Sequence, residues 1–204
     1  MDLVAENLTR SFGRRRIIGP LSFRVSPGRV LGVAGPNGSG KTTLVKTLAG
    51  LIRPTTGGVF LEGEGGRRSP RDAADRIGWV APDLALYGEL TAAENLRFFA
   101  RLHGRPDSAA WADETIARVG LDPRRVAATP LRALSTGQRQ RIKLVYATLH
   151  DPAVLFLDEP SSNLDDAGRA VVAAIVAGQR ARGVTVVASN DPGDLALSDE
   201  RVTL

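Results

Sequence analysis

Residues 30–43 read Val-Leu-Gly-Val-Ala-Gly-Pro-Asn-Gly-Ser-Gly-Lys-Thr-Thr, and this stretch constrains the fold more than any other part of the chain. The apolar, partly β-branched residues 30–34 predict a buried strand, and residues 42–49 predict a helix of about two turns that ends at Gly50. Between them, residues 35–42 match the pattern G-x-x-x-x-G-K-[ST]. A strand, a glycine-rich loop and a helix in this order predict a site that binds phosphate groups.

The pattern has a chemical reason. Glycines allow successive backbone N–H groups to approach phosphate oxygens closely, and the start of a helix adds its positive end. We expect Lys41 to bring its charge to the β- and γ-phosphates, and the Thr42 hydroxyl to bind Mg²⁺. The predicted nucleotide-binding residues of the loop are Gly35, Pro36, Asn37, Gly38, Ser39, Gly40, Lys41, Thr42 and Thr43. The alternative is a glycine-rich turn that binds nothing, and the complete pattern argues against it.

Composition limits the class of protein. The 204 residues, 43% of them hydrophobic, suffice for one compact core, and the absence of cysteine excludes disulfides and thiolate metal sites and fits a reducing cytosol. The longest apolar run, Val171–Ala177, is too short for a membrane helix, and the N-terminus lacks a signal-peptide pattern, so we expect neither membrane insertion nor export. The net charge is +5, but arginine is favoured over lysine along the whole chain, so we interpret the charge as compositional and expect no nucleic-acid partner.

Hydrophobic patterns outline the remaining elements. Leu3–Leu8 and Leu21–Val25 alternate as strands on either side of a basic loop, Gly13–Arg16, and predict an N-terminal antiparallel layer. Residues 91–103 and 108–119 have helical spacing, with a capping box at Thr91 and Glu94. Further strands are predicted at 59–63, 77–80, 154–157, 184–188 and 201–204, further helices at 135–150 and 166–182, and a Gly/Arg-rich loop from 64 to 71. Strands that alternate with crossover helices predict a mostly parallel sheet.

Two acidic residues follow one of these strands. Residues 154–160 read Val-Leu-Phe-Leu-Asp-Glu-Pro, which is typical of a strand that carries carboxylates to the C-terminal edge of a parallel sheet. In proteins with a phosphate-binding loop of this kind, the first acid, here Asp158, helps to hold Mg²⁺, and the second, Glu159, polarises the attacking water. The alternative is an acidic surface turn, which the upstream loop disfavours.

A serine before a predicted helix forms a third feature. In Leu-Ser-Thr-Gly-Gln-Arg-Gln-Arg, residues 134–141, Ser135 is a good N-cap, so one interpretation is a capped helix with a basic face. The other is a second phosphate-binding helix start, at which Ser135 and the backbone of Gly137 face a γ-phosphate. A site on an inserted lobe cannot easily reach the loop of its own chain, so we expect it to serve a second molecule.

Together these motifs resemble those of the ATP-binding cassette (ABC) ATPases over nearly the whole chain. By this resemblance, residues 35–42 are the Walker A motif, 134–138 the signature, with Thr136 where glycine is more common, and 154–158 the Walker B motif. The resemblance also makes Glu159 the catalytic glutamate, residues 162–165 the D-loop, and Phe12 the aromatic side chain that stacks on adenine. It places Ser135, Gly137 and Gln138 on the nucleotide of a partner subunit.

The resemblance implies a fold and a function. The expected fold is α/β, a P-loop ATPase with a mostly parallel core sheet, an N-terminal antiparallel layer and a helical lobe inserted at residues 83–150 of one domain, residues 1–204. The implied function is that of an ATPase subunit that uses ATP and Mg²⁺ to power a separate transmembrane permease. It would pair with a second ABC subunit and lie in the cytoplasm, on the inner face of the cell membrane. Residues 94–104 and the chain length resemble the haem exporters of cytochrome c maturation.

Two positions depart from the family pattern. Pro82 occupies the place of the Q-loop glutamine and has no side-chain donor or acceptor, so Asp83 becomes the candidate metal ligand there. Asn190 occupies the place of the switch histidine; it donates a hydrogen bond but cannot carry a charge, and it is the second candidate catalytic residue after Glu159. These departures predict slow hydrolysis. Two alternatives remain: a regulatory ATP-binding switch, which these departures favour, and a soluble ABC protein that acts on DNA or ribosomes, which the short chain disfavours.

Overall fold

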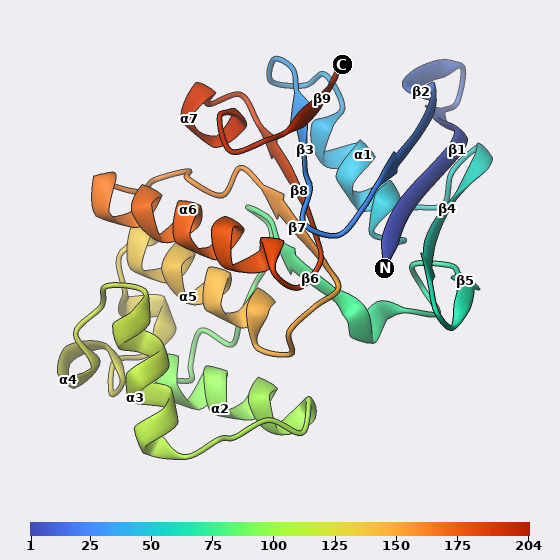
Figure 1. Ribbon diagram of the computed structural model, residues 1–204. Coiled ribbons are helices and arrows are strands. Elements are labelled where there is room, and N and C mark those ends of the chain that lie inside the picture. Colours follow the sequence, from blue (N-terminus) through green and yellow to red (C-terminus); the bar gives the residue numbers. More distant parts are fainter.

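The computed structural model describes residues 1–204 and contains two β-sheets with helices between and beside them (Figure 1). One sheet has four strands in the order β2-β1-β4-β5, and the other has five in the order β6-β7-β8-β3-β9. In chain order the elements are β1 (Asp2–Phe12), β2 (Arg15–Val25), β3 (Val30–Ala34), α1 (Lys41–Leu48), β4 (Thr56–Gly63), β5 (Gly66–Arg68), η1 (Ala74–Arg76), β6 (Ile77–Val80), α2 (Ala92–Leu102), α3 (Ala109–Arg118), α4 (Pro123–Val126), η2 (Leu131–Ala133), α5 (Thr136–Thr148), β7 (Val154–Asp158), α6 (Asp166–Arg180), β8 (Val184–Ser189), α7 (Pro192–Leu195) and β9 (Glu200–Thr203).

The five-stranded sheet is parallel throughout and is buried on both faces. On β7, Val154 and Phe156 belong to the hydrophobic cluster on the α1 side, while Leu155 and Leu157 belong to the cluster beneath α5 and α6. Successive side chains of a strand point to opposite faces, so a strand that is covered on both faces reads as a continuous apolar run. The predicted parallel core is confirmed, and it brings the ends of β3, β7 and β8 to one edge.

The four-stranded sheet is antiparallel and contributes to the same hydrophobic cluster as α1, as predicted for the N-terminal layer. Its first two strands are longer than predicted, because Phe12 pairs with Arg15 and Ser11 with Arg16. The predicted loop Gly13–Arg16 is therefore wrong at its last two residues. Only Gly13 and Arg14 form the turn, and Gly13 has the positive φ of 58° that such a turn favours.

The Gly/Arg-rich segment predicted as a loop contains a strand, β5, which corrects the prediction at Gly66–Arg68. The segment lacks β-branched residues, so its sequence carries no strand signal. Its pairing with β4 and the contacts of Arg67 stabilise it instead: the guanidinium lies 3.4 Å from the ring centroid of Phe60 and forms an ion pair of 2.6 Å with Glu6. Tertiary contacts thus override the local preference.

Helices α2, α3 and α4 lie apart from the sheets, around a hydrophobic cluster of their own (Figure 1). The predicted capping box at the start of α2 is present: the N–H of Glu94 donates to Thr91 Oγ1 at 3.1 Å, and the N–H of Thr91 donates to Glu94 Oε2 at 2.8 Å. Helix α5 joins this cluster to the core, because Ile142 packs in the cluster of the helical region and Leu144 packs in the cluster beneath the parallel sheet. The lobe boundaries of residues 83–150 remain a prediction. None of the helices has both the length and the apolar character needed to cross a membrane.

Candidate functional site

The loop between β3 and α1 presents backbone donors to one region of space. The N–H groups of Gly38, Gly40, Lys41, Thr42 and Thr43 donate to no protein acceptor within residues 1–204. Gly40 precedes the helix with a φ of 108°, and a Cβ there would lie 2.5 Å from a methyl group of Ile17, so the position needs glycine. Unpaired N–H groups at the start of a helix form an anion-binding site.

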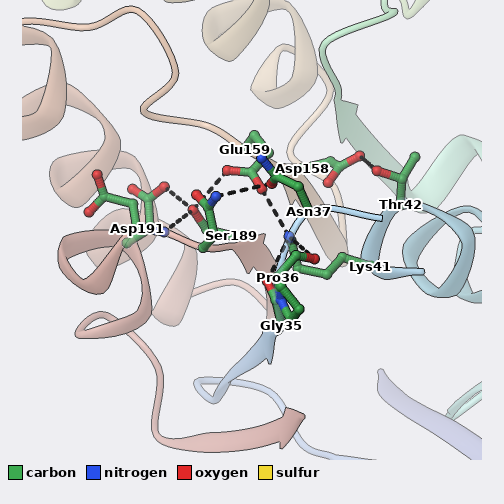
Figure 2. Close-up of polar contacts among 11 residues, drawn as sticks. Gly35, Pro36, Asn37, Lys41, Thr42, Asp158, Glu159, Ser189 and Asp191 are labelled. Carbon is green, nitrogen blue, oxygen red and sulfur yellow. Dashed lines mark hydrogen bonds and ion pairs between the residues drawn. The ribbon is translucent and has the colours of Figure 1, made fainter. Parts of the chain in front are cut away.

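Lys41 is buried, with 6% of its surface exposed, and its ammonium group lies at the centre of the site (Figure 2). Its Nζ donates to the carbonyl oxygens of Gly35 at 2.9 Å and Pro36 at 3.3 Å. It also lies 3.4 Å from Glu159 Oε1. The loop carbonyls therefore hold the positive charge beside the unpaired N–H groups, where a phosphate would meet both.

Thr42 and Asp158 bring two hard oxygen ligands together, as Figure 2 shows. The Thr42 hydroxyl donates to Asp158 Oδ2 at 2.7 Å, while Asp158 Oδ1 is buried and has no hydrogen-bond partner. Burial raises the pKa of Asp158, and the neighbouring Glu159 raises it further, while the hydrogen bond from Thr42 opposes this. A buried carboxylate oxygen without a partner, next to a hydroxyl, fits the oxygen ligands that Mg²⁺ prefers.

Glu159 follows β7 in an unusual backbone conformation, with a φ of 50°. A non-glycine residue in this region is uncommon and often marks a functional site. Its backbone N–H donates to the carbonyl of Ala188 at 2.8 Å, which fixes the residue against the end of β8. One carboxylate oxygen faces Lys41, and the other, Oε2, lies 3.0 Å from the hydroxyl of Ser189. Sequence reasoning missed Ser189, although it directly precedes Asn190 in the switch segment.

Asn190 reaches the phosphate-binding loop from the end of β8. Its side-chain Nδ2 donates to Asn37 Oδ1 at 3.0 Å. The structure thus brings this departure from the family pattern into the same site as Lys41, Thr42, Asp158 and Glu159. Its catalytic role remains a prediction, but its position is one from which an amide donor reaches the loop.

The cavity at this site has a volume of about 460 Å³. Its lining residues are Phe12, Arg15, Ile17, Asn37, Gly38, Gly40, Lys41, Thr42, Thr43 and Glu159. Phe12 is 50% exposed, so part of its ring is accessible beside the loop, and the guanidinium of Arg10 lies 4.3 Å from the ring centroid. Two larger clefts, of about 600 and 770 Å³, lie elsewhere and contain none of the predicted site residues.

Asp83 does not join Thr42 and Asp158. Lys46 Nζ donates to Asp83 Oδ2 at 2.5 Å, and this hydrogen bond is the main cause that lowers the pKa of Asp83. The carboxylate is 63% exposed. The structure therefore gives no contact that supports the predicted metal-binding role of Asp83, and Pro82 contributes only its carbonyl, which accepts from Lys143 Nζ at 3.2 Å.

Ser135, Gly137 and Gln138 lie at the start of α5 and do not line the cavity that contains Lys41. The N–H of Gln138 donates to Ser135 Oγ at 3.2 Å, and the N–H of Ser135 donates to Gln138 Oε1 at 2.9 Å, which makes a capping box. Gly137 packs closely against residue 163, since a Cβ on it would lie 2.9 Å from the carbonyl oxygen of Asn163. The chain by itself does not unite these residues with its own phosphate-binding loop.

The phosphate-binding loop, buried lysine and two acids at the edge of a parallel sheet define a P-loop nucleotide-binding protein. The sequence model of the ABC transporter family matches residues 18–162, and the chain belongs to that family as its ATP-binding domain. The match to this family gives no support to the prediction of slow hydrolysis.

Two relatives show how the chain compares in length. It is 37% identical over 205 residues to the cytochrome c biogenesis ATP-binding export protein CcmA 2 of Cupriavidus metallidurans, covering 97% of this chain and 95% of that protein. It is 33% identical over 202 residues to the probable multidrug ABC transporter ATP-binding protein YbhF of Escherichia coli, covering 98% of this chain. The chain spans only 35% of YbhF.

A solved structure shares the fold. The dimeric ATP-binding cassette MJ0796, bound to ADP and Pi, superposes with a TM-score of 0.82 at 21% identity and covers 99% of this chain and 94% of that one. The predicted fold class, a P-loop ATPase fold with one parallel and one antiparallel sheet, is confirmed.

Proposed function

We propose that this protein is the ATP-binding and ATP-hydrolysing subunit of an ABC transporter and powers a separate membrane permease. One observation carries the proposal: Lys41, Thr42, Asp158 and Glu159 converge beside five unpaired N–H groups at the start of α1. This arrangement complements the negative charge of a nucleoside triphosphate. It also places a carboxylate next to the position that an attacking water would occupy.

Each residue has a distinct role in this proposal. The loop N–H groups and the Lys41 ammonium bind the β- and γ-phosphates, and Phe12 stacks on the adenine ring. Glu159 accepts a proton from the attacking water. At the same time the water oxygen bonds to the γ-phosphorus, and the bond between the γ-phosphorus and the β–γ bridging oxygen breaks. Asn190 offers a neutral hydrogen bond toward the γ-phosphate. All these side chains are already held by contacts within the fold.

Mg²⁺ fits this site through Thr42 and Asp158. The unpaired Oδ1 of Asp158 and the Thr42 hydroxyl are the groups that would hold the ion. When bound, Mg²⁺ neutralises part of the phosphate charge during transfer. Asp83 would join only if it left Lys46, so we assign it no more than a secondary place.

The second partner is another ABC subunit. Ser135, Gly137 and Gln138 lie outside the cavity that contains Lys41, which supports a composite site shared by two subunits. The dimeric form of MJ0796 is consistent with this assembly. Two copies of this chain would make the simplest pair, in which the signature segment of each copy completes the nucleotide site of the other. Each copy would be one domain, residues 1–204, with the helical lobe at residues 83–150.

The permease would dock on the surface around Pro82–Leu90. Within this segment Tyr87 is 53% exposed, and Phe98 on α2, which packs against it, is 42% exposed. Tyr87 and Phe98 pack edge to face at 5.5 Å between ring centroids, so they form one apolar patch. Docking there would hold the subunit at the inner face of the cell membrane. The likeness to CcmA 2 supports an exporter of the cytochrome c maturation type.

A regulatory ATP-binding switch with slow turnover is the alternative, and Pro82 and Asn190 favour it. Initial rates of ATP hydrolysis separate the two functions. Asn190→His restores a group that can carry charge; if Asn190 limits the rate, turnover rises several-fold while the Kd for ATP stays nearly constant. A flat or lower turnover would mean that the Asn190–Asn37 contact already belongs to a competent site.

Nucleotide binding is tested with Lys41→Ala. We expect Mg-ATP at about 100 times its Kd to stabilise the unaltered protein by roughly 2.7 kcal/mol, and the variant to lose most of that gain, measured as a shift in Tm. Lys46→Ala is the matched control, because Lys46 pairs with Asp83 and does not line the cavity. An undiminished shift in Lys41→Ala would contradict the site.

Hydrolysis and pairing are tested with Glu159→Gln. Without the base, bound ATP stays intact, so we expect this variant to form a dimer in Mg-ATP, visible by sedimentation, and to lose ATPase activity. Ser135→Arg in the same background should prevent the dimer, since it places bulk and charge at the shared face. A Glu159→Gln protein that stays monomeric in saturating Mg-ATP, with and without its permease, rejects the composite site.

A further inference from the structure

A groove between the helical region and the core lies apart from the nucleotide site. It has a volume of about 600 Å³ and is lined by residues of α3, α5 and α6, of which α5 and α6 lie side by side (Figure 1). Its apolar wall is formed by Trp111 from α3, Val145 and Leu149 from α5 and its C-cap, and Val171 and Ile175 from α6. None of the residues that we assign to ATP lines it. The groove can therefore take a ligand of its own.

The groove follows one face of α6 from end to end. The lining residues of this helix recur every three or four positions, and four of them are small and exposed: Ala167, Ala170, Ala174 and Gly178. A Cβ added to Gly178 would meet no atom within 4 Å, so the space above the helix is open there. Helix α6 has 15 residues and is therefore roughly 22 Å long. Over this length a groove of about 600 Å³ has a mean cross-section of roughly 27 Å².

Positive charge gathers at the end of the groove next to the C-terminus of α6. Arg105 Nη2 lies 2.7 Å from Asp151 Oδ2, and Arg182 Nη1 lies 3.5 Å from Asp151 Oδ1. Two guanidinium groups thus share one carboxylate, which leaves one positive charge unbalanced. Arg182 is exposed, so exchanging its long contact for a ligand costs little. Arg118 on α3 also lines the groove, but its pair with Glu114 already balances its charge.

Shape and charge together select one class of ligand. An α-helix is at least 10 Å across and needs a cross-section of roughly 80 Å², so it is too wide for this groove. An extended peptide is narrower, but its backbone N–H and C=O groups would face apolar walls without partners. A single hydrocarbon chain has no such groups. A carboxylate at its end would complement the unbalanced charge beside Arg105 and Arg182.

We propose that this groove binds the anion of a fatty acid, with the acyl chain along α6 and the carboxylate at Arg105 and Arg182. The chain contacts Trp111 in the helical region and Ile175 in the core, so a bound fatty acid fixes one against the other. The inference goes beyond the proposed function and does not depend on it, because the groove shares no residue with the cavity that contains Lys41.

Binding is tested by calorimetry of the full chain without nucleotide, with decanoate below its micelle concentration. The affinity should rise about two- to four-fold for each methylene added between octanoate and dodecanoate, since each buries more apolar surface. The tryptophan emission should change on binding, and Trp111→Phe should lose that change, because the other tryptophan, Trp79, lies on β6 and outside the groove. An absence of binding, or an affinity that does not depend on chain length, overturns the inference.

A pair of variants at one position tests the place of the acyl chain. Gly178→Phe puts a ring into the open space and should weaken decanoate binding about 10-fold or more. Gly178→Ala is the matched control, because a methyl group leaves most of the width open, and its affinity should stay within about two-fold of the unaltered protein. The rise in Tm that decanoate causes should follow the same order. Equal affinities of the two variants contradict the assigned place.

The charge is tested without any bulky substitution. Arg182→Gln removes the unbalanced charge while Asp151 keeps Arg105, so decanoate should bind about 10-fold more weakly and its neutral counterpart 1-decanol should bind as before. Arg24→Gln, on the antiparallel sheet, is the control and should change neither. If Arg182→Gln binds decanoate as the unaltered protein does, the carboxylate is not recognised and the inference fails. It also fails if the unaltered protein self-associates without nucleotide and Gly178→Phe abolishes this in sedimentation, because a second copy then occupies the groove.

Discussion

Asp158 is a residue at which stability and function oppose each other. Its carboxylate is fully buried and one oxygen has no partner, which suits a cation but is unfavourable without one. Burial raises the pKa of Asp158 above the ordinary value of 3.8. Between these two pKa values the folded state holds more protons than the unfolded state, so the contribution of Asp158 to stability falls as pH rises through that window.

Asp158→Asn should therefore raise the Tm of the protein at neutral pH in the absence of Mg²⁺, because the amide is neutral and still accepts from Thr42. Below pH 3.8 the variant and the unaltered protein should melt together, since both side chains are then uncharged. The unaltered protein should gain more Tm from ATP with Mg²⁺ than from ATP alone, and the variant should lose this difference. Asp75→Asn, at a side chain that is 68% exposed, is the control and should show neither effect. A lower Tm at neutral pH would contradict the sign.

Among the elements, the start of α5 depends on a glycine for its packing. A Cβ on Gly137 would lie 2.9 Å from the carbonyl oxygen of Asn163, a backbone atom that cannot give way alone. The signature helix and the segment 162–165 are therefore fitted to each other. By contrast, a Cβ added to Gly178 on α6 would meet no atom within 4 Å.

Gly137→Ala should displace residues 162–165 and weaken the ATP-dependent dimer of the Glu159→Gln protein, while the monomer keeps its affinity for ATP. Gly178→Ala is the matched control. It should leave the dimer intact and stabilise the fold by about 0.5–1 kcal/mol, because alanine favours a helix more than glycine does. Sedimentation and nucleotide binding check both variants. A dimer in Gly137→Ala as strong as in the control would show that the close packing has no part in pairing.

At the scale of the whole molecule, Arg141 ties the helical region to the core. Its side chain is 10% exposed and donates to the carbonyl oxygens of Val119 at 3.2 Å and Gly120 at 3.4 Å, at the end of α3. On its other side it forms an ion pair of 2.5 Å with Asp165, the residue that caps α6. One buried guanidinium thus connects α3, α5 and α6.

Arg141→Ala should destabilise the protein by about 1–3 kcal/mol, since buried carbonyls lose their donor, and thus lower Tm by roughly 2–10 °C. We expect ATP binding to persist and ATPase activity to fall, because the phosphate-binding loop is untouched while the signature helix loses its connection to α6. The control is Arg118→Ala, which breaks an exposed pair with Glu114 and should change Tm much less. If the two variants lost the same amount of Tm, Arg141 would contribute no more to stability than the exposed Arg118.

Local signals in the sequence account for much of this result. The loop at residues 35–42, the apolar run that ends at Asp158 and Glu159, and the capping box at Thr91 each depend on contacts within a few residues. Backbone geometry and strand periodicity are properties of such short stretches, so they can be read without the fold. The parallel core followed from them, because buried strands that alternate with helices have few other arrangements.

What the sequence alone determined is therefore the order of most of the elements and the chemical types of the residues that we propose bind phosphate. Only the tertiary structure decided that Asp83 pairs with Lys46, that Asn190 contacts Asn37, and that Ser189 stands between Glu159 and Asp194. It also made a strand of Gly66–Arg68, which has no strand signal of its own. The physical reason is the same in each case: these contacts join side chains or strands whose partners are set by how the sheets, helices and loops pack, and a local pattern contains no information about that partner.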